Sequence, residues 1–561
     1  MTNRLFWWKN CAASTTSRQS RGSITWRSYF VLVFVSSLLF PGCSDHSLPG
    51  GQASSSDGSL EAGSKATRSD QAAGLPKSFD TRESIAEEAE ASEPNQLVSH
   101  PVGNDRLKTL FKDWAQPDVA VVITGRQHGY IEPCGCTGLT NQLGGLARRH
   151  SLIQSLEARG WPLARLDIGD QVRRFSAQAE LKYQSTVGGL QEMNYSSVGF
   201  GPDDLQLADL VSVLVNAKDE DQGKNLFVCA NVDYLGFNDK FHILEVNGHR
   251  IGVTSVLGDQ QLQQFSSDLA TTRPARDGLR EVIPILKEQK CEFYILLAHA
   301  GYEASLALAK EFNQFDIVVT AGGADIPRQQ PLRIGRTTFI EVGAKGMYVG
   351  VVGLFGRERS AVRYQRISLD SRWPDSQVML DRLSAYQDQL EVLGLSGLGL
   401  TAVLHPSERR FVGSEFCADC HTIATARWKE TPHSHALGSL VDPKERSETP
   451  RHFDPECISC HVTGWEPQRH IPYVSGYVGL DESPLLHDVG CESCHGPGSA
   501  HVAAENGEEQ VNEAELIQRQ KQMRLPLAKA ESRCIMCHDL DNSPDFDFNE
   551  YWKDVVHKGK N

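Results

Sequence analysis

The stretch Phe411–His421, FVGSEFCADCH, contains the pattern that decides the fold of the C-terminal third of the chain. Its last five residues have the form Cys-x-x-Cys-His, and this form recurs three more times before the C-terminus. The cysteine pairs are Cys417/Cys420, Cys457/Cys460, Cys491/Cys494 and Cys534/Cys537, and the histidines are His421, His461, His495 and His538. Four copies within this part of the chain indicate one repeated chemical function.

Cys-x-x-Cys-His is the attachment motif of c-type haem. The two thiols, one helical turn apart, add to the two vinyl groups of one haem, and the adjacent histidine is placed under the iron as its proximal ligand. Zinc or disulfides are the alternative for paired cysteines, but a zinc site needs no histidine directly after each second cysteine. The motifs therefore predict four covalently attached haems.

The same region is rich in further histidines that are candidates for the second axial position of each iron. Besides the four motif histidines, residues 405–561 contain His405, His433, His435, His452, His470, His487, His501 and His557. At most four of these are needed. Sequence spacing alone does not pair them with particular haems.

Three runs resemble the tetrahaem cytochrome c family that accepts electrons from hydroxylamine oxidoreductase: FVGSEFCADCH, WKETPHSHAL from Trp428 and VGCESCHGPGSAH from Val489. The resemblance implies electron transfer, with His433, His501 and His557 as distal ligands. It also implies an open iron at the second motif, where His452 and His470 remain rival ligands. We expect short helices wrapped around the haems, which supply the apolar core themselves.

The middle of the chain, residues 112–370, alternates apolar β-branched stretches with amphipathic ones, which is typical of a layered α/β domain. Strands are predicted from Asp118, Pro162, Asn225, Arg250, Glu292, Phe315 and Met347, and a helix around residues 143–156. Cys229 and Cys291 are expected to be buried core thiols. We expect a sandwich with polar residues at the strand ends, where such folds place their sites.

These strand-end residues resemble the calcineurin-like metallophosphatase and 5′-nucleotidase domain, but most of its metal ligands are replaced. Arg126 stands where that family has its first aspartate, Pro202 replaces the bridging asparagine, and Ala321–Ala324 replaces the final Gly-His-x-His. Two-metal hydrolysis needs a nearly complete ligand set. The resemblance leaves His128, Asp170 and His299 in register, with Asp203 and Asp204 as nearby carboxylates, and so implies one divalent or soft metal ion at most.

Cys134 and Cys136 lie in the loop after the first predicted strand, beside this site. Three interpretations stay open: a soft-metal site with His128, a strained redox disulfide, or pairing with a distant cysteine.

The N-terminal part of the sequence predicts export and a tether. Residues 1–42 combine basic residues, a short apolar run at 29–40 and small residues, as an export signal does; a membrane-anchoring helix is the alternative. The sequence around Cys43 resembles a lipoprotein cleavage site, which implies lipidation of Cys43. Residues 43–111 are Ser-, Gly- and Glu-rich, which predicts a disordered tether. Further along the chain, we expect a connecting helix and linker over residues 371–411, followed by the haem domain over residues 412–561.

The net charge of −15 argues against nucleic-acid binding and favours a redox partner with a basic docking face. We expect a periplasmic or outer-surface protein held at a membrane by its lipid. The favoured function is electron transfer. The alternatives are a metal-dependent phosphoesterase, a haem enzyme acting on a small nitrogen or sulfur compound, and a docking protein whose α/β domain positions the haems.

Overall fold

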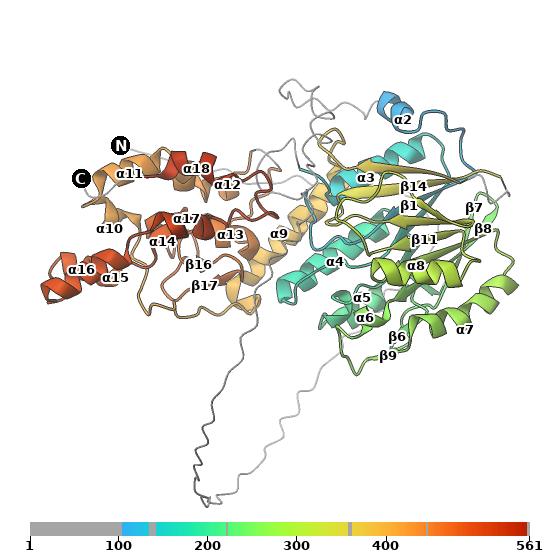
Figure 1. Cartoon of the computed structure of the whole chain (residues 1–561), viewed down its shortest axis with the longest axis horizontal. Coiled ribbons are helices and arrows are strands. Elements are labelled where there is room, and N and C mark those ends of the chain that lie inside the picture. Colours follow the sequence, from blue (N-terminus) through green and yellow to red (C-terminus); the bar gives the residue numbers. More distant parts are fainter. Residues whose placement is uncertain (1–103, 134–141, 220–222, 357–361, 445–446, 558–561) are drawn as a thin grey trace, which may run out of the picture. The chain divides into compact units, whose positions relative to one another are not determined.

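The computed structural model describes residues 104–133, 142–219, 223–356, 362–444 and 447–557 (Figure 1). All the described residues belong to one compact unit. Cys43, Cys134, Cys136 and the predicted export signal lie outside the described residues.

One mixed sheet lies at the centre of the α/β domain, with strand order β15-β14-β1-β2-β3. β1 pairs in parallel with β2 and antiparallel with β14. Every residue of β1 is buried, as expected for a central strand covered on both faces. The strands are β1 Val119–Thr124, β2 Leu163–Asp167, β3 Ser197–Val198, β14 Tyr348–Leu354 and β15 Val362–Ser368.

A second sheet has the order β12-β13-β11-β10-β8-β7, and β8, β10, β11 and β13 run parallel to one another. Its strands are β7 His242–Val246, β8 His249–Leu257, β10 Phe293–His299, β11 Ile317–Thr320, β12 Leu332–Ile334 and β13 Thr337–Glu341. Side chains from both sheets, such as Val121 and Ile295, share one fully buried cluster. The two sheets therefore pack face to face.

Helices cover the outer faces of both sheets (Figure 1). The first sheet packs against α3 Leu146–Ala158, α4 Ala177–Glu192 and α9 Gln377–Gly397, and the second against α7 Ala275–Glu288 and α8 Tyr302–Glu311. The four layers confirm the predicted α/β sandwich. Cys229 and Cys291 are buried, as expected.

Two details of the sandwich differ from the sequence-based expectation. The apolar run from Asn225 forms isolated bridges through Phe227 and Val228 instead of a full strand, since it is a buried crossing between elements. β7, β12 and β15 were not expected, because edge strands with polar, half-exposed residues carry a weak periodic signal. β13 was not expected either, although it is an inner strand whose first four residues are buried. The smaller elements are α2 Asn104–Leu110, η2 Asp204–Gln206, α5 Leu210–Asn216, β4 Lys218–Asp219, β5 Lys224–Asn225, β6 Val232–Tyr234, α6 Asp259–Leu262 and β9 Ala270–Thr272.

The predicted connecting helix is α9, and it belongs to the sandwich. Leu383, Tyr386 and Leu390 are buried in the core that covers the first sheet. Gly394 has a φ of 57°, which breaks the helical geometry inside α9.

The described residues after α9, here called the C-terminal region, form short helices and little sheet, as expected. These elements are α10 Ser414–Ala418, α11 Thr422–Lys429, η3 Pro432–His435, α12 Gly438–Val441, α13 Pro455–His461, β16 Trp465–Glu466, β17 Ile471–Pro472, η4 Pro484–Leu486, α14 Cys491–His495, α15 Ser499–Glu505, α16 Glu513–Gln522, α17 Leu527–Cys534 and α18 Phe548–Val555. No helix in the described part of the chain is long and apolar enough to cross a membrane.

Candidate functional site

Each Cys-x-x-Cys-His motif lies on a helical turn of the C-terminal region. The second and third motifs lie within α13 and α14, whereas the first and fourth begin on α10 and α17. In the first motif His421 N donates to Cys417 O at 2.9 Å, and in the fourth His538 N donates to Cys534 O at 2.9 Å. This turn brings the two thiols and the histidine of a motif to one side, as attachment to a single haem requires.

The attachment cysteines are not equally enclosed by the protein. Cys420 of the first motif and Cys494 of the third are exposed, whereas the other six are half-buried. Short helices wrapped around the haems stay a prediction, although the Cys420 side chain is open to solvent. The reason is local: α10 ends at Ala418, so Cys420 lies in the surface turn between α10 and α11. Cys420 stays a predicted attachment residue, at an edge of its site that faces solvent.

Three of the motif histidines face a second histidine. The ring centroids are 6.5 Å apart for His421 and His501, 5.8 Å for His495 and His557, and 6.0 Å for His538 and His433. Two imidazoles that bind one iron from opposite sides, each at about 2 Å from nitrogen to metal, have centroids roughly 6 Å apart. The three pairs therefore have the spacing of axial ligands.

His461, the histidine of the second motif, has no such neighbour: within the described residues no other histidine ring faces it. Of its two rivals by sequence, His452 packs edge-on against Phe453, with ring centroids 4.8 Å apart. His470 instead accepts a hydrogen bond from Arg174 Nη1, 2.8 Å from its Nδ1. The second motif thus differs from the other three, because among the described residues its histidine faces no second histidine.

The outer nitrogens of the motif histidines are held by the protein. Nδ1 of His461 lies 2.8 Å from Ala436 O, and Nδ1 of His495 lies 2.6 Å from Met523 O. Nδ1 of His538 lies 3.0 Å from Ser543 Oγ. Because Nδ1 is engaged, Nε2 is the nitrogen left to bind iron, and the ring orientation is set before any ligand arrives.

The apolar surface of the C-terminal region also fits a large flat cofactor. Its buried core is small and centres on Phe411, Trp465 and Tyr477. Apolar side chains beside the motifs are exposed instead: Phe416 is 48% exposed, Ile423 61% and Leu540 80%. Such surface is costly in water and is what a bound haem would cover.

The motifs are grouped in pairs. Cys417 of the first motif neighbours Cys491 of the third, and Cys460 of the second neighbours Cys537 of the fourth. The first motif therefore lies beside the third, and the second beside the fourth.

In the sandwich, three of the residues expected to bind metal come together at the strand ends. His128 Nε2 donates to Asp170 Oδ2 at 3.0 Å, and His299 Nε2 lies 3.9 Å from the same oxygen. Burial lowers the pKa of His128 and of His299, although Asp170 opposes the shift in both. Burial would raise the pKa of Asp170, but the hydrogen bond from His128 and the neighbouring charges bring it below its usual value.

The backbone of this site is strained in the manner of a functional site. Arg126, His128 and Asp170 all have left-handed φ, at 50°, 54° and 69°. Such angles cost a non-glycine residue of order 1 kcal/mol or more and are kept where a loop has a fixed shape.

A guanidinium lies among the remaining ligand-type side chains. Arg126 Nη2 is 3.5 Å from Asp325 Oδ1, and its charge acts on His128, Asp170 and His299. This is the position where the resembling family has an aspartate. A fixed positive charge there opposes a bound cation.

The two neighbouring carboxylates differ in role. Asp204 is fully buried and accepts hydrogen bonds from the backbone N–H groups of Gly201, Asp170 and Gln171 at 2.8 to 2.9 Å, so it braces the loops. Burial and the charge of Asp170 raise the pKa of Asp204 well above its usual value, and burial also raises that of Asp203. Within the described residues no three His, Cys, Asp or Glu side chains form a group able to hold a metal ion.

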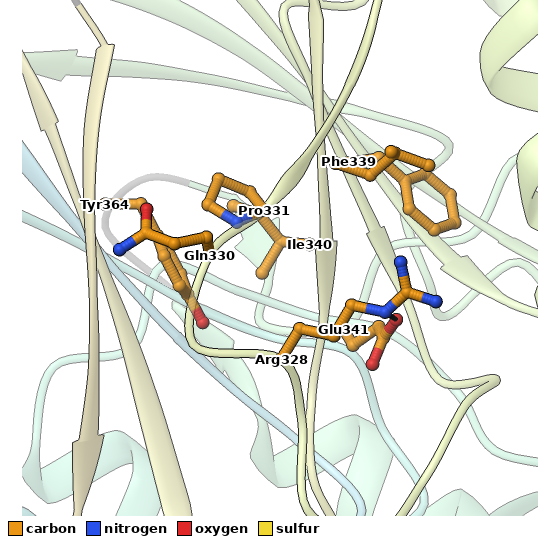
Figure 2. Close-up of a pocket in the computed structure, with 8 residues that line it drawn as sticks. Arg328, Gln330, Pro331, Phe339, Ile340, Glu341 and Tyr364 are labelled. Atoms are coloured by element: carbon orange, nitrogen blue, oxygen red, sulfur yellow. Dashed lines mark ion pairs between the residues drawn. The ribbon is translucent and has the colours of Figure 1, made fainter.

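A separate hollow lies by β13 and β15 (Figure 2). Arg328 Nε pairs with Glu341 Oε1 at 3.1 Å in this hollow, and burial raises the pKa of Tyr364. It includes none of the residues expected from the sequence to act in a site.

Sequence reasoning missed the residues that join the sandwich to the C-terminal region. Lys182 pairs with Glu456 at 2.5 Å, Glu132 with Arg451 at 2.7 Å, and Lys345 with Asp541 at 2.5 Å. No periodic or motif signal marks them, since each is a single charge in an ordinary helix or loop.

Comparisons with known proteins place the two parts in two groups. Residues 416–496 match the family described as cytochrome c554 and c-prime. The chain is 32% identical over 150 residues to cytochrome c-554 of Nitrosomonas europaea, covering 24% of this chain and 60% of that protein. It is 23% identical over 298 residues to a 5′-nucleotidase of Diplobatis ommata, covering 47% of this chain and 50% of that protein. The chain thus spans less than two thirds of either relative.

Among solved structures, a 5′-nucleotidase precursor from Thermus thermophilus is similar, at 16% identity and a TM-score of 0.42, over 58% of this chain and 68% of that one. A TM-score this low does not by itself establish a fold. The family match and the sequence relatives carry the assignment: the chain has a C-terminal cytochrome c554 domain, which implies covalent c-type haems, preceded by an α/β sandwich of the 5′-nucleotidase and calcineurin-like phosphoesterase kind.

Proposed function

We propose that this protein is an exported electron-transfer protein with four c-type haems, one at each Cys-x-x-Cys-His motif. The observation that carries the proposal is the set of three facing histidine pairs, together with a fourth motif histidine that has none. An iron held between two imidazoles exchanges electrons without offering a site to other ligands, whereas an iron with one free position can bind a small molecule.

Each of the three facing histidine pairs would bind one haem iron. His421 with His501, His495 with His557, and His538 with His433 would each hold one iron from both sides. Carbonyl oxygens of Ala436 and Met523 keep the proximal rings turned toward their irons. In the paired motifs, first with third and second with fourth, the cofactors would be neighbours, which supports electron transfer between them.

A second candidate function follows from His461. Because no histidine among the described residues faces it, the second iron would be open, and a small nitrogen or sulfur compound could be oxidised or reduced there. This activity is distinguished from simple relay by ligand binding: carbon monoxide should bind the reduced protein at one haem in four.

The sandwich is proposed to have lost dinuclear phosphoesterase activity. Arg126 adds a positive charge where the related hydrolases have a carboxylate, and Asp204 is committed to backbone hydrogen bonds. His128, Asp170 and His299 remain from the predicted ligand set, but these described side chains form no group able to hold a metal ion as they stand. We infer that the sandwich now acts mainly by holding the cytochrome domain in place.

The location and partners follow from the cofactor and the charge. The cytochrome domain implies export, and we propose a lipid anchor at Cys43 with residues 43–111 as a tether. The acidic chain would dock to a basic face of its redox partner, so that the association rate should fall as salt is added.

The experiment that tests this function is a haem count by pyridine haemochrome, made on protein matured with the c-type assembly machinery. Four haems per chain are expected. A chain carrying one haem or none would overturn the proposal.

A further inference from the structure

The sandwich contacts the second haem motif through a charged pair. Lys182, on α4, extends its Nζ to 2.5 Å from Oε2 of Glu456, which immediately precedes Cys457 on α13. The two side chains are only 14% and 30% exposed. A pair so shielded from water interacts more strongly than one on the open surface.

Side chains of the sandwich also hold the N-terminus of α13. Asp454 caps α13 by accepting a hydrogen bond from Glu456 N at 3.0 Å. Its two carboxylate oxygens also accept from Gln178 Nε2, on α4, at 2.6 Å and from Gln387 Nε2, on α9, at 2.9 Å. Two helices of the sandwich therefore fix the start of the helix that carries Cys457, Cys460 and His461.

Other charged side chains of the sandwich also reach the surroundings of the second motif. Arg174 donates a hydrogen bond to His470, which follows the motif. Glu132 adds a shielded ion pair to Arg451, just before α13. The surroundings of the second motif are thus built partly by the other domain.

The first and third motifs are braced differently. Glu492, on α14, accepts hydrogen bonds from the backbone of Val412 and Gly413 ahead of the first motif, and Cys491 N donates to Ser414 Oγ. These bonds stay within the C-terminal region. Near the fourth motif, Lys345 of the sandwich pairs with Asp541.

We propose that the sandwich controls the haem of the second motif, with Lys182 and Asp454 as positioning residues that set its reduction potential. This inference rests on the proposed function, in which that haem is the one with an open iron. Reduction potentials of haems respond to nearby charge and burial. Lys182 offsets the negative charge of Glu456 beside the haem and so favours the reduced, less positive iron.

The test is a redox titration of the holoprotein followed at the high-spin signal of the open iron, with the low-spin haems followed in parallel. Lys182→Met leaves Glu456 uncompensated, and the potential of the high-spin haem should fall. Glu456→Gln should raise it. Lys182→Arg should stay near wild type, and the double variant Lys182→Met/Glu456→Gln should return toward it.

The matched control is Lys345→Met, which removes the contact near the fourth motif and should leave the high-spin haem unchanged. If the wild type has no high-spin haem, the open iron of the proposed function is wrong. If the signal is present and Lys182→Met leaves its potential unchanged, or moves all four haems equally, the inference is overturned. The double variant keeps the test valid if Lys182→Met folds poorly.

Discussion

His495 of the third motif and His557, near the end of the described chain, face each other with ring centroids 5.8 Å apart. The two residues lie far apart in the sequence, and only the fold brings them together. The same relation joins His421 to His501 and His538 to His433. Its absence at His461 among the described residues is what distinguishes the second motif from the other three.

Removing one distal histidine should open one further iron. His501→Ala takes away the ring that faces His421, so the oxidised protein should contain two high-spin haems where the wild type has one. Electron paramagnetic resonance of the purified holoprotein measures this change. His435→Ala, at an exposed histidine, is the control and should leave the spin states unaltered; an unchanged spectrum for His501→Ala would refute the pairing.

Reversing the charge at Arg126 should restore metal binding. Arg126→Asp removes the cation beside His128, Asp170 and His299 and supplies the carboxylate that related hydrolases have at this position. The dialysed variant should retain about one Mn²⁺ or Zn²⁺ more than the wild type, measured by elemental analysis. Arg126→Asp/Asp170→Asn should lose that ion again; equal metal content in all three proteins would count against the account.

The buried ion pair of Arg149 and Asp167 should be important for stability. Both side chains are fully buried, with Nη1 3.7 Å from Oδ2, and Asp167 also accepts from Thr124 and Gln171. Asp167→Ala leaves the guanidinium without its counter-charge, and the free energy of unfolding should fall by about 3–5 kcal/mol. Asp442→Ala, at an exposed pair with Lys444, is the control in the same denaturant titration and should have little effect.

The stability should also depend on pH through His150, whose pKa is lowered by burial. Between the usual value near 6.5 and the lower folded value, the unfolded chain binds a proton that the folded chain does not, so stability falls as pH falls through this range. His150→Gln should flatten that part of the profile. The ring lies 2.7 Å from Ser376 Oγ, so the variant also tests a buried hydrogen bond; a profile with the same slope in both proteins would exclude His150 as its source.

The haem motifs and the main strands could be predicted because their signals are local. Cys-x-x-Cys-His is recognised from five residues, and buried strands such as β1 and β10 appear as continuous apolar runs. The edge strands β12 and β15 could not be predicted, because their polar residues resemble those of loops. The exposure of Cys420 could not be predicted either, since it depends on where α10 ends and on what packs beside it.

The histidine pairs show the same limit at the site. Resemblance selected His433, His501 and His557 as distal ligands, yet spacing could not match them to particular motifs, since the matching depends on how the helices pack. The contact of Lys182 with Glu456 left no trace in the sequence, because ion pairs between distant residues follow from the tertiary structure alone.

The central claim is that four haems occupy unequal positions, and one measurement tests it most directly. Haem stoichiometry should be determined on the same oxidised sample as a quantitative count of high-spin iron. The account predicts four haems per chain, of which one is high-spin and three are low-spin. Fewer than four haems, or four that are all low-spin, would contradict it.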